Sequence, residues 1–140
     1  MNPDKKLIKQ VKRTLKPYAE DVVMEESYHM DEHADFFRKI TVLSVPLRFQ
    51  EGVGLYLCEA FAGGKPAVEP NTGSFAEIVG NAGLIYEPND AQHLADALEK
   101  ILTDKQLYDR CRQHALSLAK ERYDDMVTAK QLTKLYEELQ

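Results

Sequence analysis

The sequence predicts an α/β domain in which a parallel sheet is covered by helices and is followed by a three-helix tail. Up to Tyr86, short apolar runs of strand length alternate with helical stretches, an order typical of parallel sheets. Beyond Pro88, apolar residues recur at helical spacing to the end of the chain. No internal repeat, low-complexity tract or linker interrupts the sequence, so residues 1–140 are expected to form a single domain.

The first part of the chain is expected to hold two helices and two strands. Apolar residues at helical spacing before Pro17 predict an amphipathic opening helix with basic residues on its other face. The runs Val22 to Met24 and Val42 to Pro46 have strand length and end in polar or proline residues. His29 to Lys39, between these runs, indicates a short helix. The apolar positions of the opening helix are Leu7, Ile8, Val11 and Leu15.

The middle of the chain continues this alternation. Pro66 to Val68 predicts a third strand, and Gly83 to Tyr86 predicts a fourth. A glycine-containing turn and a short helix over Phe75 to Val79 separate the two. Strands joined through helices in this way are expected to run parallel.

Three helices are expected after Pro88. Asn89 and Gln92 have the spacing of a capping box, which would mark the start of the first helix. Apolar residues in all three stretches follow helical spacing. They are Ala91, Leu94, Ala95, Leu98, Ile101 and Leu102 in the first helix, Leu107, Cys111, Leu118 and Ala119 in the second, and Val127, Leu132, Leu135, Tyr136 and Leu139 in the third.

Charge and cysteine content narrow the classes of partner. The chain has 18 Lys and Arg residues against 23 Asp and Glu, so it offers no basic field for a nucleic acid. Cys58 and Cys111 show no redox or zinc-binding spacing and are expected to be buried thiols. The start of the chain lacks the apolar core of a secretory signal, and no stretch reaches the ~18 apolar residues of a membrane span. We therefore expect a cytoplasmic protein.

The segment Glu51 to Ala60, EGVGLYLCEA, is the most informative for function. It follows a predicted strand and a short polar loop, and indicates a glycine turn that leads into a helix. Ligands of open α/β sheets gather beyond the carboxyl ends of the strands, where a helix N-terminus presents N–H groups and partial positive charge. Gly52 and Gly54 remove side chains where an anionic or sugar ligand would approach the backbone.

Glu51 and Glu59 would stand at the two ends of such a site. Glu51 lies at the mouth of the turn, whereas Glu59 falls about two turns into the helix, ~12 Å away or less. An offset of about 80° around the helix points the side chains apart, so they are not an acid/base pair on one helix face. Two simpler explanations stay open: many α/β domains have glycine turns without a ligand, and the helix dipole alone favours a Glu near a helix start.

A metal site is a further alternative at His29, Asp31, His33 and Asp35, which alternate in sequence. These residues would share one face only on a strand. Because the surrounding sequence predicts the start of a helix, they would scatter, and a solvated helix cap is favoured over a set of metal ligands.

From Val42 to Asn89 the chain strongly resembles the C-terminal domain of family-four glycosyltransferases, which are retaining enzymes of the GT-B fold. The resemblance rests on two Glu residues separated by seven residues and followed by Ala-x-Ala-x-Gly-x-Pro. This pattern is complete at Glu51, Glu59, Ala60, Ala62, Gly64 and Pro66. The similarity continues through the tail, where DAQHLADALEKILTD and KQLTKLYEEL resemble the last helices of that domain.

The resemblance implies a Rossmann-like domain that binds a nucleotide-diphosphate sugar as donor substrate. Glu51 would lie by the transferred sugar at the catalytic centre, and Glu59 would bind the ribose hydroxyls. The backbone groups expected to contact the sugar and diphosphate are those of Gly52, Val53, Gly54 and Leu55. The GT-B scheme requires no metal, and the chain has no Asp-x-Asp pattern of metal-dependent sugar transferases, so we expect neither a metal nor a cofactor.

The chain also departs from the family pattern. The family domain normally begins with two further strand–helix units that carry an Arg and Lys pair, and nothing before Val42 matches that pair. Arg48 and Lys65 are the only nearby cations. The missing strands would leave a gap in the sheet. We expect the chain to close it either by bringing the strands around Val22 and Val42 together or by pairing with a second copy as a homodimer.

Three functions stay open at this point. The favoured one is transfer of a hexosyl group from a nucleotide-diphosphate sugar to an unknown acceptor with retention, although the chain alone is expected to bind the donor weakly and turn over little. The alternative is a non-catalytic nucleotide-sugar-binding or assembly module. A more distant one is an epimerase of the same fold superfamily. A peripheral position at the membrane in a full-length enzyme also stays open.

Overall fold

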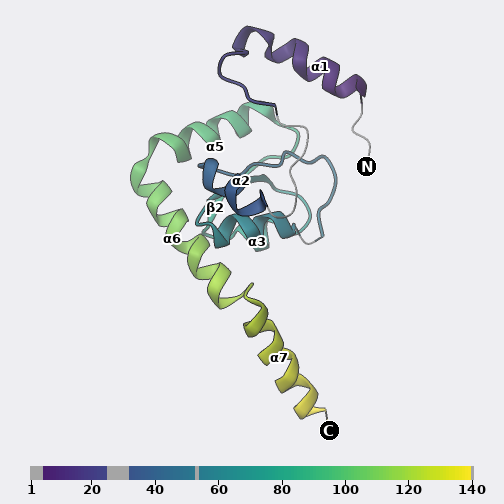
Figure 1. The fold of residues 1–140 in the computed structure, drawn as a ribbon, viewed down its shortest axis with the longest axis vertical. Helices are drawn as coiled ribbons and strands as arrows, with labels where there is room; N and C mark the ends of the chain where they lie inside the picture. The colour runs from purple at the N-terminus through teal and green to yellow at the C-terminus, as the bar shows by residue number, and fades with distance from the viewer. Residues whose placement is uncertain (1–4, 25–31, 53, 140) are drawn as a thin grey trace. The chain divides into compact units, whose positions relative to one another are not determined.

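A computed structural model describes residues 5–24, 32–52 and 54–139. The chain divides into two compact units, residues 1–32 and residues 33–140. The first contains α1 (Lys5–Leu15) and the 3-10 turn η1 (Lys16–Tyr18). The second contains, in chain order, α2 (His33–Lys39), α3 (Leu55–Ala62), β1 (Ala67–Pro70), α4 (Phe75–Val79), β2 (Gly83–Tyr86), α5 (Ala91–Thr103), α6 (Lys105–Glu121) and α7 (Asp125–Glu138) (Figure 1).

The sheet in the second unit is parallel, as the alternation of strands and helices predicts. β1 pairs with β2 in parallel, with Ala67 opposite Gly83 and Pro70 opposite Tyr86. On the other side of β1, Leu43 forms an isolated parallel bridge with Ala67. The predicted α/β class is confirmed as a helix-rich fold with a small parallel sheet.

Pairing on this second side of β1 stops after Leu43. Its N–H donates to the carbonyl of Pro66 and its carbonyl accepts the N–H of Val68, both at 2.9 Å. The next two bonds of the ladder would run from the N–H of Val45 to the Val68 carbonyl and from residue 70 to the Val45 carbonyl, and Pro70 has no N–H. The Ser44 hydroxyl donates to the Val68 carbonyl at 2.7 Å, where the next backbone N–H would bind.

Two predicted strands are therefore lost in the structure, and a third, predicted over Pro66 to Val68, is shifted to Ala67–Pro70 as β1. The segment from Val42 to Pro46 is reduced to the single bridge at Leu43. Residues 22–24 form no strand, and Val23 is 86% exposed, so this apolar run lacks the packing that favours a strand. The sheet is not closed by pairing these two segments, and pairing with a second copy stays a prediction.

The predicted helices are present within the described residues. α4 has the predicted bounds, and α5, α6 and α7 form the three-helix tail (Figure 1). α2 begins at His33, and residues 29–31 of the predicted helix lie outside the described residues.

The predicted cap of α5 is one residue too early. The carboxylate of Asp90, rather than the side chain of Asn89, accepts the N–H of Gln92 at 2.9 Å and that of His93 at 3.0 Å. Asn89 has a φ of +62° and lies in the turn before the helix. The hydrogen bond from His93 is the main reason that the pKa of Asp90 lies below its ordinary value.

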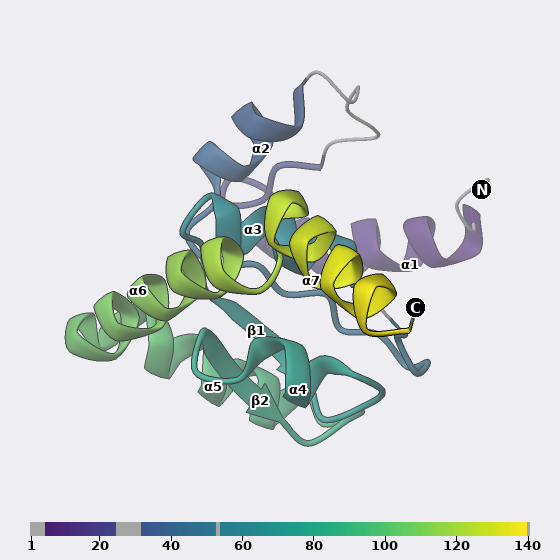
Figure 2. The ribbon, with the colours of Figure 1, turned by 90° about the horizontal axis from the view of Figure 1, so that it is seen from below.

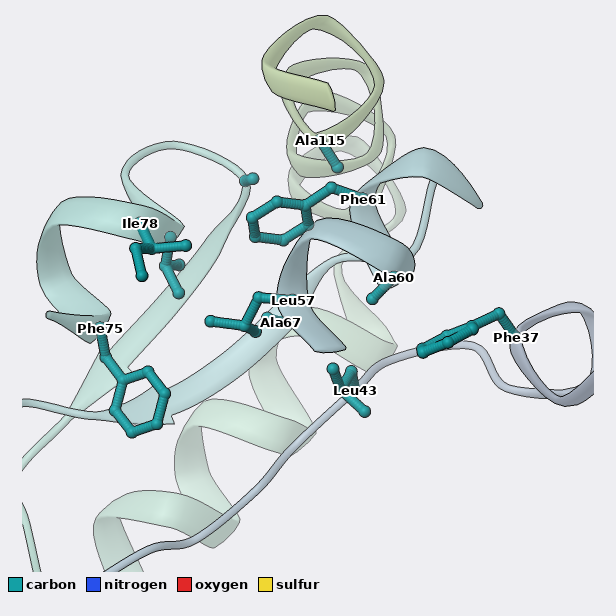
Figure 3. Close-up of a cluster of buried hydrophobic side chains, with 11 residues drawn as sticks. Phe37, Leu43, Leu57, Ala60, Phe61, Ala67, Phe75, Ile78 and Ala115 are labelled. Atoms are coloured by element: carbon teal, nitrogen blue, oxygen red, sulfur yellow. The ribbon is translucent and has the colours of Figure 1, made fainter. Parts of the chain in front are cut away.

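The core of the second unit lies on both faces of β1, between α3 and α5 (Figure 2). Side chains alternate along a strand, so Ala67 packs with α3 and α4 whereas Val68 packs with α5 and α6. Figure 3 shows Leu57 and Phe61 pointing from α3 into the first of these clusters. The cluster fixes α3, which follows the glycine turn, against the sheet.

The last helix, α7, is exposed over most of its length, and Val127 is half-buried. None of its described residues is buried, although the predicted apolar positions lie on it. Leu135 is 50% exposed and Tyr136 63% exposed. Within the described part of the chain, no helix is both long and apolar enough to cross a bilayer.

Leu57 should be a main support of α3, because its side chain is completely buried. Leu57→Ala should lower the free energy of unfolding by roughly 2–5 kcal/mol, since it removes apolar contacts and leaves a cavity. Leu102→Ala, at a 57% exposed position on α5, is the matched control and should change it by less than about 0.5 kcal/mol. Urea unfolding followed by circular dichroism measures both variants. Equal losses would contradict the buried role of Leu57.

Candidate functional site

Two loops meet at the carboxyl edge of the sheet. One covers residues 47–54 and leads into α3, and the other covers residues 71–74 and joins β1 to α4. Ser74 donates to the carbonyl of Glu51 through both its backbone N–H and its hydroxyl, each at 3.0 Å. Both loops follow segments that run parallel, so they lie where open α/β sheets bind ligands.

Gly73 allows the two loops to approach this closely. Its φ is +54°, in the left-handed region that favours glycine. A Cβ at this position would overlap the carbonyl oxygen of Glu51 and lie 2.6 Å from its nitrogen. The backbone of Glu51 thus fills the space of a side chain at residue 73. We call this contact between Glu51, Gly73 and Ser74 the loop clasp.

The side chain of Glu51 turns back over its own loop. Its Oε1 accepts the N–H of Gly52 at 2.9 Å, and a Cβ on Gly54 would lie 3.7 Å from its Cγ. Gly54 is the N-cap of α3 in the left-handed conformation, and no side chain caps this helix. The carboxylate therefore lies by the turn that opens α3. Val53, the predicted donor-binding residue between these glycines, lies outside the described residues.

Gly52 and Leu55 line a hollow of about 390 Å³ on the outer side of this turn. Arg122, at the end of α6, brings a cation to this hollow that the sequence did not indicate. It forms an ion pair with Glu77 at 2.8 Å and lies over the ring of Tyr123, 5.7 Å from its centre. The helical tail thus contributes to the surroundings of the glycine turn.

Glu59 lies further along α3 and faces α2. Its Oε1 is 3.3 Å from the Nδ1 of His33. It lines a separate hollow of about 400 Å³ together with Arg38 and Lys65. The structure therefore groups Glu51, Gly52, Gly54 and Leu55 and places Glu59 apart on the same helix. Of the two cations considered from sequence, Arg48 is exposed, and the Nζ of Lys65 donates to the Arg38 carbonyl at 3.5 Å.

Glu69 is a buried carboxyl group beneath the two loops that the sequence analysis did not identify. It is 0% exposed, and its two oxygens accept the N–H of Val45 at 3.1 and 3.2 Å. Burial raises the pKa of Glu69 to about 8, and the hydrogen bond from Val45 offsets this only in part. The group therefore carries its proton at neutral pH. The sequence feature that could have identified it is an acidic residue within the apolar run that forms β1.

Tyr56, on α3, lies between the two acidic groups. Burial, followed by the charges of Glu69 and Glu51, raises the pKa of Tyr56 to about 12. Its hydroxyl oxygen is buried and makes no well-formed hydrogen bond within the described ranges. Both acidic groups, Glu69 and Glu51, therefore act on the Tyr56 hydroxyl.

The residues considered as metal ligands have other contacts where they are described. His33 faces Glu59, and Asp35 forms an ion pair with Arg38. His29 and Asp31 lie outside the described residues. In the described ranges no group of three or more possible ligands comes together. The absence of a metal stays a prediction.

The family model for "Glycosyl transferases group 1" matches residues 4–117. The chain belongs to this family. Among curated relatives, this glycosyltransferase chain is 42% identical over 74 residues to "Probable sucrose-phosphate synthase 2" of Oryza sativa subsp. japonica. It is 43% identical over 70 residues to "Sucrose-phosphate synthase" of Spinacia oleracea. The matched segments are 51% and 49% of this chain, and 8% and 7% of those two proteins.

Solved structures of glycosyltransferases share the fold. HepE of Anabaena in complex with UDP superposes with a TM-score of 0.84 at 20% identity, over 99% of this chain and 38% of that one. Sucrose-phosphate synthase of Thermosynechococcus elongatus gives 0.79 at 24% identity, over 94% and 34%. The C-terminal domain of LpcC of Francisella tularensis gives 0.77 at 22%, over 89% and 66%. The predicted Rossmann-like, GT-B type of α/β fold is confirmed.

Gly73→Ala should open the loop clasp of this glycosyltransferase chain. A left-handed non-glycine residue costs about 1–2 kcal/mol, and the added Cβ also displaces the backbone of Glu51. Gly52→Ala is the control in the facing loop, because its Cβ would meet nothing within 4 Å. Urea unfolding gives the loss of stability, and amide hydrogen exchange at Ser74 reports the clasp. Equal effects of the two substitutions would contradict the close approach.

Glu69 should make stability depend on pH in one direction. Its pKa is about 8 in the folded chain against an ordinary value of 4.5, so the folded state holds a proton that the unfolded state releases. Glu69 contributes its full stabilisation when the pH is below the ordinary pKa of the group. This contribution is lost as the pH rises through the pKa of the folded state, by at most about 1.4 kcal/mol per pH unit. Glu69→Gln should remove this slope in urea unfolding between about pH 5 and pH 8. An unchanged slope would contradict a buried, protonated Glu69.

Proposed function

We propose that this chain forms the donor-binding part of a retaining glycosyltransferase that takes a hexosyl group from a nucleotide-diphosphate sugar. Membership of the family supports glycosyl transfer. The choice of a nucleotide-sugar donor rests on the position of Glu51 beside the glycine turn before α3. This turn lies at the edge where such sheets bind ligands. HepE, which shares the fold, has been crystallised with UDP and with UDP-glucose.

In this proposal Glu51 is the catalytic group. Breaking the bond between sugar and diphosphate builds positive charge on the sugar ring and negative charge on the leaving group. The carboxylate of Glu51 stabilises the first, and the backbone N–H groups of the turn stabilise the second together with the positive end of α3. The N–H groups assigned to the sugar and diphosphate are those of Gly52, Val53, Gly54 and Leu55.

Glu59 binds the ribose in this proposal. It is the fifth residue of α3, a little more than one turn from the glycine turn, so a donor that contacts both acidic residues extends along the start of the helix. The Glu59 carboxylate now faces His33 at 3.3 Å, and the ribose hydroxyls would share it with the imidazole. No metal or cofactor takes part.

Acceptor binding is assigned to a further domain. The chain spans 34% and 38% of two of the solved structures that it resembles, and a smaller share of the curated plant proteins. The acceptor, the complete reaction and its stereochemistry are therefore proposed for a larger assembly. The chain by itself should bind the donor weakly and turn over little.

Calorimetric titration with UDP-glucose, ADP-glucose and GDP-mannose tests this proposal. We expect heat of binding with at least one donor, and Glu59→Ala should weaken that affinity about tenfold or more, because it removes hydrogen bonds between a carboxylate and the ribose. Glu99→Ala, an exposed carboxylate on α5, is the matched control and should leave the affinity unchanged.

Two outcomes would decide against this function. Absence of heat with every donor favours the non-catalytic assembly module. Conversion of a nucleotide sugar to a free sugar inverted at C2, detected by chromatography, would indicate the epimerase instead.

A further inference from the structure

Between Leu43 and Glu51 the chain leaves the sheet, and the cause is a break in the hydrogen-bond ladder. In a continued parallel ladder, Val45 would donate to the Val68 carbonyl and residue 70 would donate to the Val45 carbonyl. The Ser44 hydroxyl already donates to the Val68 carbonyl at 2.7 Å, and Pro70 has no N–H. Both bonds of the ladder are therefore lost at the same point.

Glu69 replaces the first of these bonds with its side chain. Its carboxyl oxygens accept the N–H of Val45 at 3.1 and 3.2 Å. The carbonyl of Val45 accepts the N–H of Leu47 at 2.7 Å, which closes a three-residue turn across Pro46. The chain thus bends away from β1 at a residue whose N–H is held by Glu69.

Glu69 interacts with this loop and with residues near the sheet edge. It is 0% exposed, and burying a carboxyl group is costly unless the group is hydrogen-bonded. Its oxygens accept the N–H of Val45, and its ionised form raises the pKa values of Tyr56 and Tyr86. Glu51 also raises the pKa of Tyr56, so the acidic groups at the two ends of the loop act on one hydroxyl.

We infer that Glu69 is a positioning residue for the donor site: by holding Val45, it sets where the loop leaves the sheet and so places the carboxylate of Glu51. The loop is then fixed at its start by Glu69 and at its end by the loop clasp. Glu69 acts through the backbone and has no contact with the donor, because it is completely buried. The role rests on the proposed function.

Three substitutions separate positioning from simple stability. Glu69→Gln keeps an oxygen that can accept the Val45 N–H, whereas Glu69→Leu leaves that N–H without an acceptor. Glu69→Asp moves the acceptor back by one methylene and carries the test if the Leu variant does not fold. Val68→Ala is the control, because Val68 is equally buried on the same strand but packs against α5 and α6.

Donor titration of the 140-residue chain is the first measurement. Glu69→Leu and Glu69→Asp should weaken the affinity about tenfold, the effect of losing one oriented hydrogen bond to the loop. Glu69→Gln should keep it within about twofold, and Val68→Ala should lower the melting temperature without changing the affinity. Equal donor affinity in the wild type and in Glu69→Leu would overturn the inference.

Amide hydrogen exchange at Ser74 is the second measurement and needs no donor. The Ser74 N–H donates to the Glu51 carbonyl, so its protection reports the position of the loop. Exchange should become faster in Glu69→Leu and Glu69→Asp and should stay at the wild-type rate in Glu69→Gln. If the wild-type chain binds no donor, the proposed function fails while this readout still decides the role of Glu69. Unchanged Ser74 protection in the Leu and Asp variants would overturn it.

Discussion

The sheet ladder beside β1 ends at the bridge at Leu43, because the next N–H, that of Val45, goes to the Glu69 side chain and Pro70 has no N–H for the bond after it. The segment that follows leaves the sheet: the Ser44 hydroxyl donates to the Val68 carbonyl of β1, and the Glu69 carboxyl group accepts the N–H of Val45. The chain released in this way crosses to the neighbouring loop, where Glu51 meets Gly73. The arrangement of the carboxyl edge therefore follows from the point at which this ladder ends.

The candidate site contains glycines, but packed residues on both sides of the turn hold it in place. Glycines open the turn before α3, yet the turn is flanked by a buried helix and by the loop clasp. Leu57 and Phe61 anchor α3 to the sheet, so the two acidic residues on and before this helix keep a fixed spacing (Figure 3). Fixed groups stabilise developing charge better than mobile ones, because they need no reorganisation during the reaction.

Local patterns predicted the elements that depend on local sequence. β2 and α4 have their predicted bounds, since each is a short apolar run closed by turn residues. The segment from Val42 to Pro46 could not be predicted correctly, because its pairing depends on a proline 24 or more residues away. The cap of α5 was missed by one residue, since neighbouring Asn89 and Asp90 are both good capping types and only backbone conformation separates them.

The sequence likewise identified some residues of the candidate site and missed others. Glu51 and Glu59 lie in one continuous segment, before and on α3, and a motif within a single segment can be found from sequence. Glu69 and Arg122 reach the site from other elements, and periodicity carries no information about which side chains meet across the fold. Glu69 also breaks the rule that strand interiors are apolar, and such departures tend to occur where a group has a role beyond packing.

The contact between Gly73 and the Glu51 backbone also constrains how this domain can evolve. Any side chain at residue 73 must push the facing loop aside, so inherited variation there is costly. Arg48 and Phe49, in contrast, are exposed in that same loop and can be exchanged without disturbing either anchor. Divergence between descendants of this domain should therefore accumulate at residues 48 and 49, while the glycine opposite them is retained.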